Sequence, residues 1–236
     1  YYGGIKKYQW VSIPLAIHGT VAKKDGTTVD IVVGEKDDDP VLVISDLLIH
    51  LAGEQMEKKA SVVIEGEGLD VLVGSKPLAT EDKEEKELVK ATILTFLKDN
   101  YGIEEEDFLS AELEVVPAGK ARDCGFDRSM IMGYGHDDRI CAFTSLFAML
   151  EVENPERTSC CLLVDKEEIG SVGATGMQSR FFENAVAELV ALTVGESSLK
   201  AKRALQNSYM LSSDVSAAYD PMFANAFEKK NTAYFG

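Results

Sequence analysis

The sequence predicts an α/β protein whose first hundred residues are rich in β-structure. Short apolar runs bounded by turn residues fill that first part, whereas strand-like runs alternate with helical stretches from Ala111 onward. Such alternation is typical of βαβ units and of a largely parallel sheet covered on both faces. With 236 residues, of which 45% are apolar and 27% charged, the chain can form the core of one or two domains.

Two strands joined by a tight turn open the β-rich part. Residues 11–24 and 27–33 flank an Asp-Gly dipeptide at 25–26, which suits the positive φ angles of a two-residue hairpin turn. Further short strands are expected at 41–44 and at 69–73, the second of which ends at a break rich in glycine and proline. This part therefore predicts a hairpin with additional short strands.

A helix and then an alternating pattern follow. We expect a helix that Thr80 caps at its N-terminus and that ends at Gly102. Its first turns are rich in acidic residues. The later elements are expected in this order: a strand at 111–116, a helix at 137–150, a buried strand at 159–164, helices at 176–194 and 200–205, and an apolar segment at 209–212. In the helix at 137–150 the apolar side chains Ile140, Phe143, Phe147 and Leu150 are expected to point inward.

Charge and cysteine content exclude several classes of partner. The chain has 24 Lys and Arg against 40 Asp and Glu, a formal net charge of −16, which argues against nucleic acid or an anionic membrane surface. Four cysteines without a C-x-x-C pair indicate a reducing compartment. No apolar run approaches the roughly 18 residues that span a bilayer, and the N-terminus lacks a signal-peptide pattern. We therefore expect a cytoplasmic protein.

Acidic residues stand where an α/β sheet usually binds its ligands, at the carboxyl ends of strands. Glu167 and Glu168 follow the predicted strand at 159–164, Asp214 follows another apolar segment, and Asp137 begins a helix after a glycine-rich turn. On extended backbone neighbouring side chains point to opposite sides, so one glutamate is able to hold a metal while the other faces an activated water. Each acid by itself is equally compatible with a solvated loop or a cap, but their joint placement favours a metal site.

The stretch DKEEIGS at 165–171 resembles the D-x-E-E-[IV]-G-S motif of the aminopeptidase I (aspartyl aminopeptidase) family of two-zinc metallopeptidases. Four other stretches resemble the family in the same order: YGG at 2–4, LLIHL at 47–51, GHDD at 135–138 and SSD at 212–214. The resemblance extends over essentially the whole chain and is greatest for the bacterial subgroup of probable aminopeptidases 1.

The resemblance implies a role for each site residue. Asp137 would bridge two Zn²⁺ ions per subunit, for which Co²⁺ or Mn²⁺ are possible substitutes, and Glu168 and Asp214 would each bind one ion. Glu167 would be the general base that deprotonates the attacking water. His50 would reach the active site of a neighbouring subunit and polarise the scissile carbonyl, although a lone histidine on an apolar segment is also compatible with a core position.

The resemblance also implies a fold and an assembly. The fold would be a partial three-layer α/β sandwich: residues 1–10 form its edge, 11–108 form an inserted β-rich lid and dimerisation domain, and 109–236 form the central part of the catalytic domain. The substrates would be peptides with a free N-terminus. The enzyme would be a homo-oligomer built from dimers, a tetrahedral dodecamer.

The histidines depart from the family pattern. Family members take two further metal ligands from histidines, but this chain has only His18, His50 and His136. His18 lies in a predicted strand and is expected to be structural, and His136 stands at the wrong place in the order of motifs. Because three carboxylates alone would hold two zinc ions weakly, we expect an interior portion of a longer enzyme that is inactive by itself.

Two other functions remain open from the sequence. A tetrahedral aminopeptidase of the glutamyl type also uses a Glu-Glu pair, but the LIHL segment and the length of the insert count against it. A non-catalytic assembly or scaffold protein would keep the fold without metals. The presence of all four acids, Asp137, Glu167, Glu168 and Asp214, favours the peptidase over the scaffold.

Overall fold

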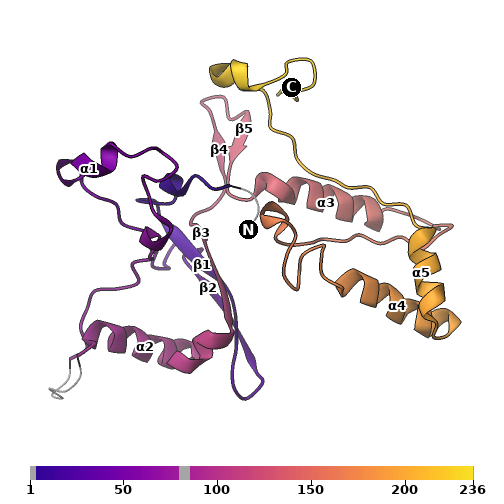
Figure 1. Cartoon of the computed structure of the whole chain (residues 1–236), viewed down its shortest axis with the longest axis horizontal. Helices are drawn as coiled ribbons and strands as arrows, with labels where there is room; N and C mark the ends of the chain where they lie inside the picture. Colours follow the sequence, from indigo (N-terminus) through magenta and orange to yellow (C-terminus); the bar gives the residue numbers. More distant parts are fainter. Residues whose placement is uncertain (1–3, 80–85, 236) are drawn as a thin grey trace. The chain divides into compact units, whose positions relative to one another are not determined.

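The computed structural model describes residues 4–79 and 86–235, which separate into two units. One unit runs from Ile5 to Tyr134, and the other comprises Gly4 and the chain from Gly135 onward. The course of the chain through both is drawn in Figure 1.

An antiparallel sheet of three strands, in the order β2-β1-β3, is the centre of the unit Ile5–Tyr134 (Figure 1). Its strands are β1 (Leu15–Ala22), β2 (Thr28–Val33) and β3 (Ala111–Pro117). The predicted β1–β2 hairpin is confirmed. In its turn the carboxylate of Asp25 accepts hydrogen bonds from the backbone N–H and the hydroxyl of Thr27, at 2.9 and 2.6 Å, and Gly26 has a φ of 83°. These contacts fix the tight turn that the Asp-Gly dipeptide predicts.

β3 joins this sheet and not a parallel one. It pairs with β1 along its whole length, from Leu15 opposite Pro117 to Val21 opposite Ala111. The prediction of a strand at 111–116 is confirmed, but its expected place in a parallel sheet is wrong, because local sequence does not specify which distant strand supplies the hydrogen bonds. The two compact units divide at 4/5 and 134/135, and the predicted domains divide at 10/11 and 108/109.

One hydrophobic cluster of this unit joins the sheet to the end of helix α2 (Leu88–Tyr101). Val21 and Ile31 of the sheet and Ile103, which follows the helix, are almost fully buried, and Leu97 of α2 packs against them. The helix ends as predicted at Gly102, whose left-handed conformation lets its N–H bond to Lys98 at 2.9 Å. The helix begins at Leu88, after the non-helical residues Lys86 and Glu87, and so later than predicted; the expected cap Thr80 itself lies outside the described residues.

Replacing Ile103 with alanine is expected to lower the free energy of unfolding by about 2–5 kcal/mol, because the side chain is only 1% exposed and its removal leaves a cavity in this core. Leu109→Ala is the matched control, since Leu109 is 93% exposed. Urea denaturation measures both. Equal midpoints for the two variants would contradict this description of the core.

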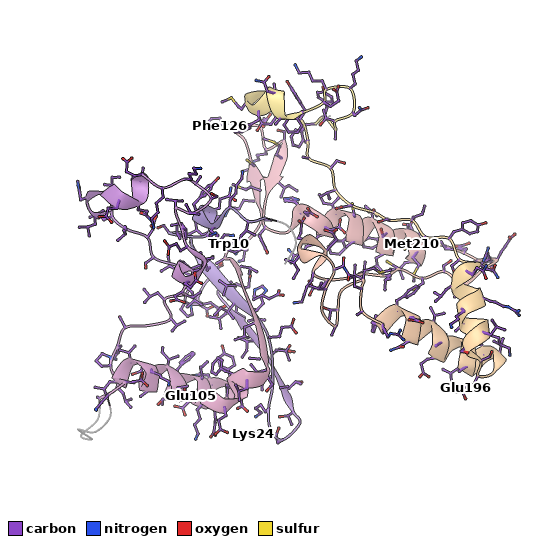
Figure 2. The ribbon with its side chains drawn as sticks, in the orientation of Figure 1. Trp10, Lys24, Glu105, Phe126, Glu196 and Met210 are labelled. Atoms are coloured by element: carbon purple, nitrogen blue, oxygen red, sulfur yellow. The ribbon has the colours of Figure 1, made fainter. Side chains whose placement is uncertain are left out.

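The remaining elements of this unit are short. They are the 3-10 helices η1 (Lys7–Gln9), η2 (Ile49–Leu51), η3 (Gly66–Gly68) and η4 (Glu105–Ser110), helix α1 (Gly53–Met56) and the strands β4 (Arg122–Cys124) and β5 (Met130–Met132). The strands predicted at 41–44 and 69–73 are reduced to isolated bridges, one of which joins Val43 to Leu72. β4 and β5 form a hairpin of their own, with Phe126 fully exposed in its turn (Figure 2).

The unit from Gly135 onward is helical in its regular part. Among the described residues it contains α3 (His136–Leu150), α4 (Phe181–Val194), α5 (Ser198–Gln206) and the 3-10 helices η5 (Glu167–Ile169) and η6 (Pro221–Ala226). The helices predicted at 137–150 and 200–205 are confirmed. The one predicted at 176–194 begins later, at Phe181, because residues 174–179 belong to a loop.

The parallel sheet expected in this second unit is not found. Among its described residues the only strand pairing is one parallel bridge between Ala218 and Ala233. The predicted buried strand at 159–164 is irregular, and Leu163 and Val164 are exposed. An apolar run of this length becomes a buried strand only where neighbouring strands bond to it, and the described residues offer none.

Apolar side chains that were expected to point inward are exposed. Ile140, Phe143, Phe147 and Leu150 of α3 are between 53% and 64% exposed, although Phe143 and Phe147 stack on each other at 6.3 Å. None of the helices in the described part of the chain has the length and apolar character required to span a bilayer.

Candidate metal centre

Two adjacent acids lie in the first turn of helix α3. Gly135 precedes the helix in a left-handed conformation with φ of 81°, and Asp137 and Asp138 have non-helical backbone angles. The peptide bond between these two aspartates is cis. Both carboxylates thus lie at the N-terminal end of a helix of 15 residues, where the helix dipole favours negative charge.

A third aspartate, Asp214, lies close to these two. Carboxylate oxygens of Asp137, Asp138 and Asp214 all lie within 4.8 Å of one another, and the three side chains are exposed. Asp214 stands on an irregular segment, where its carboxylate accepts a hydrogen bond from the N–H of Val215 at 2.7 Å. The structure therefore brings the predicted ligands Asp137 and Asp214 together and adds Asp138, which sequence reasoning did not single out as a ligand.

Glu167 and Glu168 lie on the 3-10 turn η5 and not on the extended backbone that the sequence predicts. The residues on either side, Lys166 and Gly170, have positive φ angles of 61° and 92°. The N–H of Gly170 closes the turn by bonding to the carbonyl of Glu167 at 2.8 Å. Adjacent side chains still diverge on such a turn, because each residue advances the chain by about a third of a turn.

Glu168 lies among the other acids of the site. The charge of Asp137 and a hydrogen bond to its side chain raise the pKa of Glu168, and the charges of Glu167 and Asp214 raise it further. A raised pKa means that the carboxylates disfavour one another when all are ionised. A divalent cation among them would offset this repulsion, and carboxylate oxygens are ligands that zinc accepts and that can be shared between two ions.

The histidines occupy other places. His50 lies on η2 of the unit Ile5–Tyr134, where it is exposed, whereas the acids belong to the unit from Gly135 onward. His18 on β1 makes a hydrogen bond of 2.7 Å with the carboxylate of Glu35, which agrees with its predicted structural role. His136 is the first residue of α3.

Comparisons with known proteins converge on one family. Residues 1–236 match the family model described as aminopeptidase I zinc metalloprotease (M18). A probable M18 family aminopeptidase 1 from Clostridium acetobutylicum is 64% identical over 236 residues, which are 100% of this chain and 50% of that protein. The chain thus spans about half the length of the curated relatives it matches.

Solved structures agree with the sequence match. The crystal structure of aminopeptidase I from Clostridium acetobutylicum has a TM-score of 0.82 with this chain at 64% identity, and it covers 99% of this chain and 50% of its own. The M18 enzyme of Thermotoga maritima has a TM-score of 0.86 at 45% identity, with coverages of 100% and 52%. A dodecamer of mApe1 from S. cerevisiae, with a TM-score of 0.63 at 22% identity, covers 99% and 51% and is alike in fold alone.

Proposed function

Because the chain belongs to the M18 family of aminopeptidase I zinc metalloproteases, we propose that it supplies the carboxylate ligands and the general base of an aminopeptidase that removes the first residue from peptides with a free N-terminus. The observation that carries the proposal is the meeting of Asp137, Asp138 and Asp214 within 4.8 Å of one another, with Glu168 near enough for the charges of Asp137 and Asp214 to raise its pKa. Its fold would be the central part of a three-layer α/β sandwich, with Ile5–Tyr134 as lid and subunit-contact domain.

Asp137 is the acid best placed to be shared by two cations. Asp137 is the largest cause of the raised pKa of Glu168, and its carboxylate lies within 4.8 Å of that of Asp214. Glu168 and Asp214 would then each bind one of the two zinc ions, for which Co²⁺ or Mn²⁺ would be substitutes. Asp138 also has a carboxylate oxygen within 4.8 Å of the other two aspartates. It would be an additional metal ligand or would orient the ligand Asp137.

Zinc in this site would lower the pKa of a water molecule and polarise the scissile carbonyl. Glu167 stands beside the ligand Glu168 on the same turn, with its side chain exposed. It would take the proton of the attacking water and deliver it to the departing amine, which is the role of a general base followed by that of a general acid.

The test of this proposal uses a chimaera in which these 236 residues replace the matching half of the Clostridium acetobutylicum relative. We expect the chimaera to release the first amino acid from unblocked peptides but not from N-acetylated ones. A chelator should abolish the release and added zinc should restore it. The 236 residues alone are expected to be inactive. A folded, zinc-loaded chimaera without peptidase activity would contradict the proposal and favour a scaffold.

The assembly is proposed to be a homo-oligomer of dimers, a tetrahedral dodecamer, in line with the dodecamer formed by the yeast relative. His50 lies in an exposed apolar segment, since Leu48, Ile49 and Leu51 beside it are 63% to 72% exposed. Such a patch is typical of a protein interface, and His50 would enter the site of the neighbouring subunit. The cytoplasm stays the expected location, in keeping with four free cysteines.

Mixed oligomers test whether His50 acts across subunits. The variants His50→Ala and Glu167→Gln, each inactive as chimaera homo-oligomers, should regain roughly a quarter of the parental activity when co-expressed, because random pairing restores one site in half of the dimers. Activity is measured as release of the first residue from a peptide. No recovery in the mixture would show that His50 acts within its own subunit, and full activity of His50→Ala by itself would show that His50 has no part in the reaction.

A further inference from the structure

We propose that Thr175 and Gln178 are positioning residues that hold the Glu167–Glu168 turn against the other acids of the site. This inference rests on the proposed function. Both residues belong to the segment 165–178, named here the carboxylate loop. Hydrogen bonds between Asp165 and Thr175 bring the beginning of this loop close to its end. Neither contacts substrate or metal in the proposal, so each acts through the backbone of the loop.

The two ends of the carboxylate loop are joined by a double contact. The N–H of Asp165 donates to the carbonyl of Thr175 at 3.2 Å, and the hydroxyl of Thr175 donates back to the carboxylate of Asp165 at 3.2 Å. The same carboxylate accepts the N–H of Lys166 at 2.7 Å. The side chain of Asp165 thus ties Thr175 to the residue that precedes the glutamates.

A second set of contacts closes the loop on the other side of the turn. The N–H of Ser171 donates to the carbonyl of Lys166 at 2.8 Å, which spans the turn. Gln178 bonds to both residues that follow the turn: its backbone N–H donates to the carbonyl of Ser171 at 3.1 Å and its amide side chain donates to the carbonyl of Gly170 at 2.5 Å. Gly176 packs so closely that a Cβ there would lie 2.1 Å from the carbonyl oxygen of Ser171.

These contacts oppose two forces that would open the turn. Lys166 and Ser171 have φ angles of 61° and 58°. Residues other than glycine seldom adopt such positive φ angles unless surrounding contacts hold the backbone there. In addition, the turn places Glu168 within hydrogen-bond reach of Asp137, a group of like charge. Without the ties from Thr175 and Gln178, both effects would move Glu167 and Glu168 away from the aspartates.

Thr175 is suited to a positioning role because it contributes little to the core. Its side chain is exposed, and the only hydrogen bond found for its hydroxyl among the described residues is the one to Asp165. Thr175→Val removes that hydroxyl at nearly constant volume, and Thr175→Ser restores it. Thr193→Val is the matched control, since Thr193 is also exposed and the hydrogen bonds of its hydroxyl within the described part of the chain go to Leu189 and Val190 of helix α4.

The experiment compares these variants in the chimaera by kcat, KM, zinc affinity and the melting temperature without metal. In Thr175→Val we expect kcat and zinc affinity to fall about tenfold or more, with KM changed less than about twofold, since residues that orient ligands typically have effects of this size. Thr175→Ser and Thr193→Val should match the parent. Gln178→Met, which keeps the volume and loses the amide, should behave as Thr175→Val. Amide hydrogen exchange should rise at Gly170 and Ser171 in both loop variants.

The outcomes separate this inference from the proposed function. Parental kcat and zinc affinity in both loop variants would overturn the inference while leaving the peptidase intact. A fall in kcat accompanied by a lower melting temperature of the metal-free variant would also overturn it, because the residues would then act by stabilising the fold and not by positioning the glutamates. A parent chimaera that binds no zinc and releases no amino acid would overturn the proposed function and this inference with it.

Discussion

Replacing Glu167 with glutamine is expected to lower kcat of the chimaera about 10²–10⁴-fold, which is the usual contribution of a general base. The amide keeps the size of the side chain but cannot accept a proton from the attacking water. Zinc content should stay unchanged, because the proposal assigns the ligands to Asp137, Glu168 and Asp214. The measurement is kcat for an unblocked dipeptide together with metal analysis of the same sample.

The control for this variant is Glu183→Gln. Glu183 lies in the first turn of α4, is paired with Arg180 at 3.9 Å, and is not one of the clustered acids. It should retain parental kcat. Full activity in Glu167→Gln would remove Glu167 from the mechanism, and loss of zinc from that variant would make it a ligand and not a base.

Replacing Gly19 with alanine is expected to have the largest effect on stability, a loss of about 4 kcal/mol or more. Gly19 lies in the middle of β1 with φ of 152°, and a Cβ there would lie 2.0 Å from the carbonyl oxygen of Glu112 on β3. This oxygen is backbone and belongs to a paired strand, so relief of the clash requires β3 to separate from β1. Urea denaturation of the chain measures the loss.

Gly53→Ala is the matched control for that variant. Nothing lies within 4 Å of the position where its Cβ would be, and Gly53 is the first residue of helix α1. Its unfolding midpoint should stay close to that of the parent. A Gly19→Ala variant as stable as Gly53→Ala would contradict the close pairing of β1 and β3.

Local signals predicted those parts of the fold that local interactions determine. The Asp-Gly dipeptide determines the β1–β2 turn by its own hydrogen bonds, and Gly102 ends α2 because it adopts the left-handed conformation. The partner of β3 was predicted wrongly because strand pairing depends on residues 90 to 102 positions away in the sequence. The run at 159–164 has the composition of a strand but no neighbouring strand among the described residues.

The site was predictable in its residues and not in its geometry. By composition alone, Glu167, Glu168, Asp137 and Asp214 are equally compatible with solvated loops and helix caps, and only the resemblance to a family assigned them roles. Asp138 was missed as a ligand, although its position next to Asp137 was an available signal. The positive φ of Lys166, which sets the turn of the glutamates, depends on hydrogen bonds across the carboxylate loop that the sequence does not display.

The most direct test of the central claim is the location of zinc in crystals of the chimaera, by anomalous diffraction at the zinc edge. The proposal predicts two zinc peaks that share the carboxylate of Asp137, with Glu168 bound to one and Asp214 to the other. Both peaks should disappear from crystals of a variant in which Asp137 is replaced by asparagine. Zinc bound elsewhere, or no zinc between these carboxylates in a catalytically active crystal, would contradict the assignment of the metal centre.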